Sequence, residues 1–237
     1  MTAPEHIAVV LPARNEEELL PAALSSVHAA ARALGAADLD GRRVSVSVTV
    51  VLDSCTDSSE EEAYRARDLW APELGLRILS GSFGTVGAAR AAGIAAQPLR
   101  SGLWIANTDA DTVVPEHWLL HQHRLASAGY GLVLGTAVPD PADLTDDELR
   151  AWQQLHPLGE GHPHIHGASM GFSAGAYHRA GGFAPLASHE DVDLAARIKA
   201  AGTAWTATDT MRVVTSGRRD GRAPEGFSRF LRQLLTG

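Results

Sequence analysis

From residue 7 to residue 138, short apolar runs alternate with longer amphipathic segments, and this regular alternation limits the folds open to the chain. Runs rich in β-branched residues are typical of buried strands, and apolar residues spaced three or four apart are typical of helices. The expected strands cover residues 7–11, 44–52, 76–79, 103–106 and 132–138. The expected helices cover about residues 16–34 (ended by Gly35), 59–70 and 87–96, with a fourth opened by Pro115. The pattern predicts right-handed crossovers and an α/β fold with a doubly wound, mostly parallel sheet covered by helices on both faces.

Beyond residue 139 the pattern becomes less regular. We expect helices at 143–155 and 188–201, a strand at 169–173, two short strands at 203–208 and 211–215, and a terminal helix at 227–235. A histidine-rich loop (156–167) and an arginine-rich loop (216–225) separate them. The chain has no internal repeat or credible linker, so its 237 residues are expected to form a single domain, 1–237.

Charge and composition exclude several classes of protein. The net charge of −8 argues against a nucleic-acid partner, because phosphate backbones attract clustered positive charge. Cys55 is the only cysteine, so the chain cannot form an internal disulfide. No apolar run is long enough for an integral membrane segment, and charged residues interrupt any candidate signal peptide. We therefore expect a soluble, cytoplasmic protein.

Two acidic segments suggest chemistry. Asp109 and Asp111 directly follow the strand at 103–106, and ligands of open α/β sheets lie beyond the carboxyl ends of strands. Two carboxylates separated by one small residue suit Mg²⁺ or Mn²⁺ when substrate phosphates supply the other ligands. An isolated Asp-x-Asp is more often a surface turn. A second acidic segment, residues 190–193, favours the functional interpretation.

Six motifs occur in the order found in a known family. They are Val10-Leu11-Pro12-Ala13-Arg14-Asn15-Glu16-Glu17, Val51-Leu52-Asp53-Ser54-Cys55-Thr56-Asp57, Val86-Gly87-Ala88-Ala89-Arg90, Asp109-Ala110-Asp111, Gly181-Gly182-Phe183 and Glu190-Asp191-Val192-Asp193-Leu194. Over about residues 5–235 the chain resembles family 2 glycosyltransferases of the GT-A fold. The resemblance implies transfer of a sugar from a nucleotide-diphosphate donor to a hydroxyl acceptor. It also implies a nucleotide-sugar-binding half, about residues 5–138, and an acceptor-binding half, about residues 139–237.

The resemblance assigns most donor contacts to the first half of the chain. The turn after the first strand would line the nucleotide pocket with Pro12, Ala13, Arg14, Asn15 and Glu16. These residues also suit a strand-to-helix turn without any binding role. Asp53 would contact the base or ribose, and Asp57 is a weaker candidate. A carboxylate at position 53 would equally suit the N-cap of the next helix. The family commonly has paired aspartates followed by Gly-Ser here, so this chain's Leu52-Asp53-Ser54-Cys55 leaves the base open.

The third and fourth motifs would complete the donor site. Gly87 would let the backbone approach the ligand, and Arg90 would contact the diphosphate or form an ion pair that orders the acidic site. Asp111 would bind the metal directly, while Asp109, with Ala110 between them, would contact the ribose or the metal through water. Related enzymes often add a late histidine ligand, but none of the 11 histidines lies beyond residue 189.

The last acidic motif would supply the catalytic base. Asp191 would take the proton of the acceptor hydroxyl, with Glu190 as the substitute candidate, and in-line attack would invert the anomeric centre. The competing interpretation is structural, because Ser188 and Asp191 have the spacing of a helix capping box.

Two loops remain open to interpretation. The alternating His162, His164 and His166 suit surface positions, an acceptor wall or, least well, a zinc site. Arg218 and Arg219 would close over the diphosphate, unless they belong to a solvated charged loop.

Two rival functions are weighed against glycosyl transfer. A nucleotidyltransferase also uses carboxylate-held Mg²⁺, but residues 12–15 match its phosphate loop poorly. A catalytically silent nucleotide-sugar-binding module would agree with the altered second motif and the missing histidine.

Overall fold

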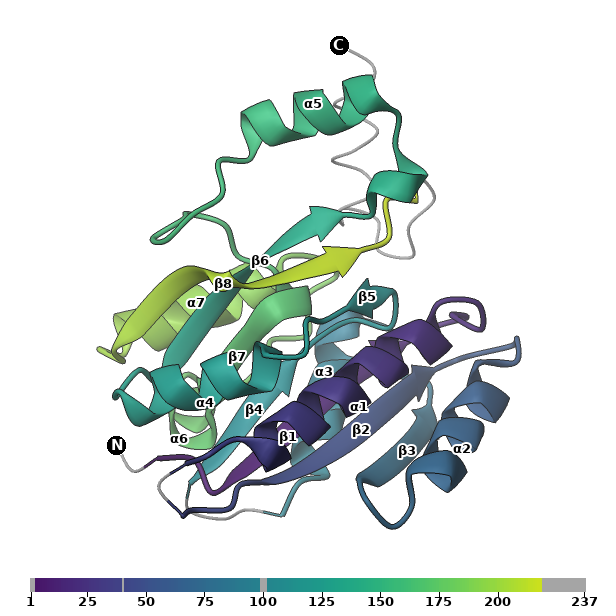
Figure 1. Cartoon of the computed structure of the whole chain (residues 1–237), viewed down its shortest axis with the longest axis horizontal. Helices are drawn as coiled ribbons and strands as arrows, with labels where there is room; N and C mark the ends of the chain where they lie inside the picture. The colour runs from purple at the N-terminus through teal and green to yellow at the C-terminus, as the bar shows by residue number, and fades with distance from the viewer. Residues whose placement is uncertain (1–2, 40, 99–101, 219–237) are drawn as a thin grey trace.

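The computed structural model describes residues 3–39, 41–98 and 102–218, which form a single α/β domain around an eight-stranded mixed sheet (Figure 1). The strands are β1 His6–Ala13, β2 Ser45–Asp53, β3 Gly75–Gly81, β4 Leu103–Asn107, β5 Thr112–Val113, β6 Leu132–Pro139, β7 Met170–Ser173 and β8 Trp205–Thr215. The α-helices are α1 Leu20–Ala36, α2 Ser59–Trp70, α3 Val86–Ala95, α4 Trp118–Ser127, α5 Asp146–Leu155, α6 Ala174–Arg179 and α7 Glu190–Ala200. Two 3-10 turns, η1 Pro141–Asp143 and η2 Gly167–Ser169, complete the described elements.

The strand order is β3-β2-β1-β4-β7-β6-β8-β5. The first four strands in this order are parallel, so the carboxyl ends of β1, β2 and β4 meet at one edge. Strand β7 is antiparallel to both β4 and β6, and β8 returns parallel to β6. The predicted α/β sheet is confirmed. Of its antiparallel strands, β7 lies in the half of the chain where the sequence pattern was irregular, whereas the two-residue β5, which pairs with β8, lies in the regular half.

Helices cover both faces of the sheet, as the alternation predicted. Strand β1 is buried along its whole length, and its successive side chains enter two separate cores. Ile7, Val9 and Leu11 pack with α1, α2 and α4, whereas Ala8 and Val10 pack with α3, α6 and α7. Burying each large aliphatic side chain contributes roughly 1.5–3 kcal/mol. No helix within the described residues is long and apolar enough to cross a membrane.

Several predicted boundaries were wrong, each for a local reason. Helix α1 begins at Leu20 rather than residue 16; Asn15 has a left-handed backbone, and the backbone N–H of Glu16 donates to the Ser59 hydroxyl at the start of α2. It also continues through Gly35, which faces open space. Helix α4 begins at Trp118, whose N–H donates to the carbonyl of Pro115, so Pro115 belongs to the preceding turn.

The second half of the chain contains larger differences. The two strands expected at 203–208 and 211–215 form the single strand β8, with an irregular register opposite Gly135 and Ala137. Helix α5 begins at Asp146, because Thr145 and Glu148 form a capping box. The short elements β5 and α6 were not predicted. The helix expected at 227–235 lies outside the described residues.

Candidate active site

A cleft of about 470 Å³ opens at the edge where β1, β2 and β4 end. The loop 165–168, residues 187–192 before and within α7, and the end of β8 with its following residues form its other walls. Twelve of the fifteen residues predicted to bind the donor or act in catalysis line it: Pro12, Ala13, Arg14, Glu16, Asp53, Arg90, Asp109, Ala110, Asp111, Glu190, Asp191 and Arg218. The two acidic segments, more than seventy residues apart in the chain, therefore face one cavity.

Asn15 and Gly87 are not among the residues that line this cleft. Asn15 has a left-handed backbone (φ 54°), and its side-chain oxygen accepts a 2.7 Å hydrogen bond from the N–H of Thr56. It therefore joins the loop after β1 to the loop after β2. Gly87 is buried against α7, where an added Cβ would lie 3.0 Å from the Glu190 Cγ. The close approach predicted for Gly87 is to another helix rather than to the cleft. Arg219 lies outside the described residues.

Asp53 lies at the end of β2, where it lines the cleft and is 6% exposed. Its Oδ1 accepts hydrogen bonds from the backbone N–H groups of Phe83 (2.7 Å) and Gly84 (3.3 Å). The N-cap of α2 is Ser58, so the alternative role of Asp53 as a helix cap was wrong. Asp57 instead accepts hydrogen bonds from Ser59 and from the N–H of Glu17, which places it in the contact between two loops.

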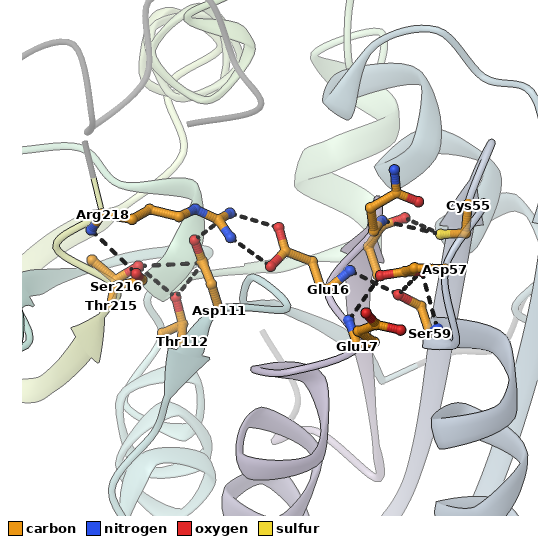
Figure 2. Close-up of polar contacts among 12 residues, drawn as sticks. Glu16, Glu17, Cys55, Asp57, Ser59, Asp111, Thr112, Thr215, Ser216 and Arg218 are labelled. Atoms are coloured by element: carbon orange, nitrogen blue, oxygen red, sulfur yellow. Dashed lines mark hydrogen bonds and ion pairs between the residues drawn. The ribbon is translucent and has the colours of Figure 1, made fainter. Parts of the chain in front are cut away.

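Arg218 connects the first turn to the acidic pair after β4 (Figure 2). Its two terminal nitrogens donate to both carboxylate oxygens of Glu16 at 2.6 Å, and one of them also lies 3.0 Å from Asp111 Oδ2. Such forked pairs combine charge with fixed geometry. The guanidinium thus contacts carboxylates in the part of the cleft where the sequence analysis expected it to meet the diphosphate.

Burial and the nearby charge of Asp109 raise the pKa of Asp111 to about 6, against the opposing effect of Arg218. The hydroxyl groups of Thr112 and Thr215 each lie 3.3 Å from Asp111 Oδ1 and orient the carboxylate. The carboxylates of Glu16, Asp109 and Asp111 lie close together and two of them already bind the Arg218 guanidinium, so their negative charge favours a cation at this position. Within residues 3–39, 41–98 and 102–218, however, no three His, Cys, Asp or Glu side chains form a group that could bind a metal ion. The acidic pair therefore fits a divalent ion only when other ligands, such as donor phosphates, complete its shell.

Arg90 forms ion pairs with both acidic segments. The side chain extends from α3 and is 3% exposed; it contacts Asp109 at 2.5 Å and Glu190 through its other terminal nitrogen. The sequence analysis gave two possible roles for Arg90, a contact to the diphosphate or an ion pair that orders the acidic site. The structure shows the ion pair. Burial raises the pKa of Glu190, although the positive charge of Arg90 opposes that effect. The Glu190 carboxylate is buried and occupied by Arg90, whereas Asp191 is partly exposed in the cleft, so Asp191 is the more accessible of the two candidate bases.

Asp191 lies in the first turn of α7 and lines the cleft. Its Oδ2 accepts a 2.7 Å hydrogen bond from the N–H of Gly167, and its Oδ1 accepts one from the N–H of Val192. The N-cap is His189, which has a left-handed backbone (φ 62°) and no capping side-chain bond. The capping box expected between Ser188 and Asp191 is therefore not formed. The Asp191 carboxylate is instead oriented by a loop from another part of the chain.

The histidine-rich loop forms a stack of rings beside the cleft. Trp152 stacks on His156 (centroids 4.8 Å apart), and His164 lies 5.2 Å from His156 and 6.0 Å from His166. His156 and His166 line the cleft, while His162 is buried, so the expectation of surface positions was wrong for His162 and His166. Burial, helped by the neighbouring imidazoles, lowers the pKa of His166 to about 4. His166 is therefore neutral at pH 7.

Sequence reasoning missed three residues of this region, namely His156, Ile165 and Gly167, all of which line the cleft. The spacing of Trp152 and His156 by one helical turn was a signal for the ring stack. No local pattern marked Gly167, because its partners Arg90 and Asp191 are distant in the chain. The zinc site is not formed by the described histidines.

The profile of glycosyl transferase family 2 matches residues 8–178. The chain belongs to this family, which makes it a glycosyltransferase by family. No curated protein matches its sequence.

Three solved structures share the fold. TarS residues 1–349 from S. aureus, in complex with UDP-GlcNAc, aligns with 100% of this chain and 66% of its own length, with a TM-score of 0.67 and 13% identity. The mannosyltransferase PcManGT from Pyrobaculum calidifontis, in complex with GDP-Man and Mn²⁺, aligns with 95% of this chain and 68% of its own, with a TM-score of 0.66 and 21% identity. A mycobacterial protein gives a TM-score of 0.61 at 21% identity, over 98% of this chain and 73% of its own. This chain thus spans about two thirds of the length of the TarS fragment.

Proposed function

We propose that the protein transfers a sugar from a nucleoside-diphosphate donor to a hydroxyl acceptor with inversion of the anomeric centre, and that it requires Mg²⁺ or Mn²⁺. The main support is that one cleft is bounded by Asp109 and Asp111 on one side and by Asp191 on another. Membership of glycosyl transferase family 2 supports the reaction class. The TarS and PcManGT complexes contain UDP-GlcNAc and GDP-Man, which supports a nucleotide-sugar donor.

The donor would lie along the ends of the parallel strands. In this proposal residues of about 5–138 hold the nucleotide sugar, with the base and ribose near Asp53 and the turn at 12–16. Asp111 and Asp109 would hold the divalent ion, which neutralises charge on the departing diphosphate when bound. Arg218 and Arg219 would contact the diphosphate, and a guanidinium already next to Asp111 supports this for Arg218.

The acceptor would enter from the side formed by residues of about 139–237. Asp191 accepts the proton of the attacking hydroxyl as its oxygen forms a bond to the anomeric carbon. The bond from that carbon to the diphosphate oxygen breaks on the opposite face, and the nucleoside diphosphate leaves with the bonding electrons. Attack opposite the leaving group inverts the configuration. Neutral imidazoles of His156 and His166 would offer flat faces and hydrogen-bonding nitrogens to the acceptor.

Thermal shift and turnover test this proposal together. Nucleoside diphosphates and their sugars are screened with and without Mn²⁺, and binding raises the unfolding temperature by mass action. We expect one nucleotide to give the largest shift, and only with the metal present. Incubation of the matching nucleotide sugar should then release nucleoside diphosphate. Metal-dependent donor binding without any release would instead identify a catalytically silent binding module, and no shift with any nucleotide would contradict the proposal entirely.

A further inference from the structure

Gly167 occupies a buried position at the start of η2, where it contacts both walls of the cleft. On one side, its backbone N–H donates the 2.7 Å hydrogen bond to Asp191 Oδ2. This N–H is part of a rigid backbone, so it fixes the direction of a carboxylate oxygen more firmly than a mobile side chain would. The orientation of Asp191 therefore depends on where the loop at Gly167 lies.

On the other side, the α-carbon of Gly167 faces the guanidinium of Arg90. A Cβ added here would lie 2.5 Å from each terminal nitrogen of Arg90 and 2.6 Å from its Cζ. These distances are far below van der Waals contact, so only a hydrogen atom fits between the loop and the guanidinium. The position of the loop is thus limited by the position of Arg90.

Arg90 has little freedom to move away. Its terminal nitrogens are paired with Asp109 and Glu190, and its Cζ lies 5.9 Å from the centroid of the Phe183 ring. Glu190 in turn packs against the surface of Gly87 on α3. Asp109, Arg90, Gly167 and Asp191 therefore form a continuous series of contacts from the end of β4 to the first turn of α7.

We propose that Gly167 is a positioning residue for the transfer reaction. By packing against Arg90, it keeps the Asp191 carboxylate in a fixed position and orientation relative to the donor site. The inference rests on the proposed function, in which Asp191 accepts the acceptor proton. A side chain at position 167 must displace either Arg90 or the loop. Displacement of the loop moves the N–H of residue 167 away from the Asp191 carboxylate. Displacement of Arg90 disturbs its ion pairs with Asp109 and with Glu190, the neighbour of Asp191. The proposed nucleotide contacts on β1 and β2 are untouched in both cases.

The first test is Gly167→Ala. A displacement of about 1 Å in reacting groups lowers rates by roughly 100-fold, so we expect a fall of about that size in kcat with a donor KM within about 3-fold of the unaltered value. The matched control is Gly175→Ala on α6, where the added Cβ meets only Arg179 at an ordinary 3.4 Å. Its kcat should stay within about 2-fold. An unchanged kcat in Gly167→Ala, or an equal loss in the control, would overturn the proposal.

Double variants test the two contacts separately. Lysine at position 90 keeps the charge but removes the two terminal nitrogens that meet the added Cβ, so Gly167→Ala should reduce kcat by less than about 3-fold in an Arg90→Lys background. In an Asp191→Asn background, Gly167→Ala should have no further effect. Independent, multiplicative losses in both backgrounds would show that Gly167 acts through neither residue, and the proposal would fail.

The outcomes distinguish this inference from the proposed function. If the unaltered protein releases no nucleoside diphosphate from any nucleotide sugar, the proposed function fails and the inference fails with it. If the unaltered protein turns over but the paired substitutions act independently, only the positioning role of Gly167 fails. If Gly167→Ala does not fold, the single variant Arg90→Lys and the double variant Arg90→Lys/Gly167→Ala still test the proposal. The proposal requires that the kcat values of these two variants agree within about 3-fold.

Discussion

The proposed donor side and the proposed acceptor side of the cleft, called the donor side and the acceptor side below, are built differently. The donor side consists of residues 12–14, Glu16, Asp53 and residues 109–111, which lie at or just after the ends of parallel strands in a continuous sheet. The acceptor side consists of His156 and residues 165–168 and 187–192, which lie on a loop, a 3-10 turn and the start of a helix. Backbone pairing fixes the first region. Contacts between residues far apart in sequence, such as the N–H of Gly167 with the Asp191 carboxylate, fix the second, so substitutions should affect the two sides in different ways.

The largest expected effect separates catalysis from donor binding. Asp191→Asn removes the proposed proton acceptor and should lower kcat by about 10²–10⁴-fold, with the donor KM nearly unchanged. The matched control is Asp193→Asn, because Asp193 pairs with Arg197 on α7 and is not among the residues lining the cleft. Steady-state kinetics with saturating acceptor measures both. Loss of donor affinity with retained kcat in Asp191→Asn would place this residue on the donor side instead.

A smaller effect is expected from Arg218→Gln. Loss of a charge-assisted hydrogen bond to the diphosphate removes about 1.5–3 kcal/mol, which corresponds to a roughly 10- to 150-fold higher donor Kd. The matched control is Arg212→Gln, whose side chain pairs with Asp209 outside the cleft. Isothermal titration with the nucleotide in the presence of Mn²⁺ gives both constants. Equal donor Kd values for Arg218→Gln and the unaltered protein would mean that Arg218 only neutralises Glu16 and Asp111.

The smallest expected effect is a decrease in the free energy of unfolding at acidic pH, caused by His166 on the acceptor side. Burial lowers the pKa of His166 from 6.5 to about 4, so the unfolded chain takes up the proton first and stability falls as pH drops from about 6.5 towards 4. Between pH 7.5 and 5.5 this loss is on the order of 1 kcal/mol. Asp111, with its raised pKa, acts in the opposite direction, so the comparison of His166→Gln with the unaltered protein isolates the histidine.

Urea unfolding at the two pH values measures this difference. The unaltered protein should lose more stability on acidification than His166→Gln does. The amides of residues 156–167 should also lose hydrogen-exchange protection before those of β1 and β2. Equal pH dependence in the two proteins would show that His166 is more open to solvent than its surroundings indicate.

Much of the donor side could be predicted from sequence, because strands β1, β2 and β4 are short apolar runs that end directly at polar motifs. A buried strand ends where its apolar run ends, so Asp53 and Asp109 were placed correctly at strand ends. The single strand β8 could not be predicted, because its irregular register depends on pairing with β6. The capping box at Ser188 was wrong for a similar reason, since the Asp191 side chain accepts hydrogen bonds from the N–H groups of Gly167 and Val192 rather than from Ser188.

The sequence by itself determined the α/β architecture, the family, and the cluster of acidic groups at the ends of strands, because periodicity and motif order are local properties of the chain. Only the tertiary structure decided which charges are paired: Arg90 with Asp109 and Glu190, and Arg218 with Glu16 and Asp111. It also decided that Gly167 orients Asp191. Such pairings depend on distances between residues that the sheet brings together, and no spacing along the chain encodes those distances.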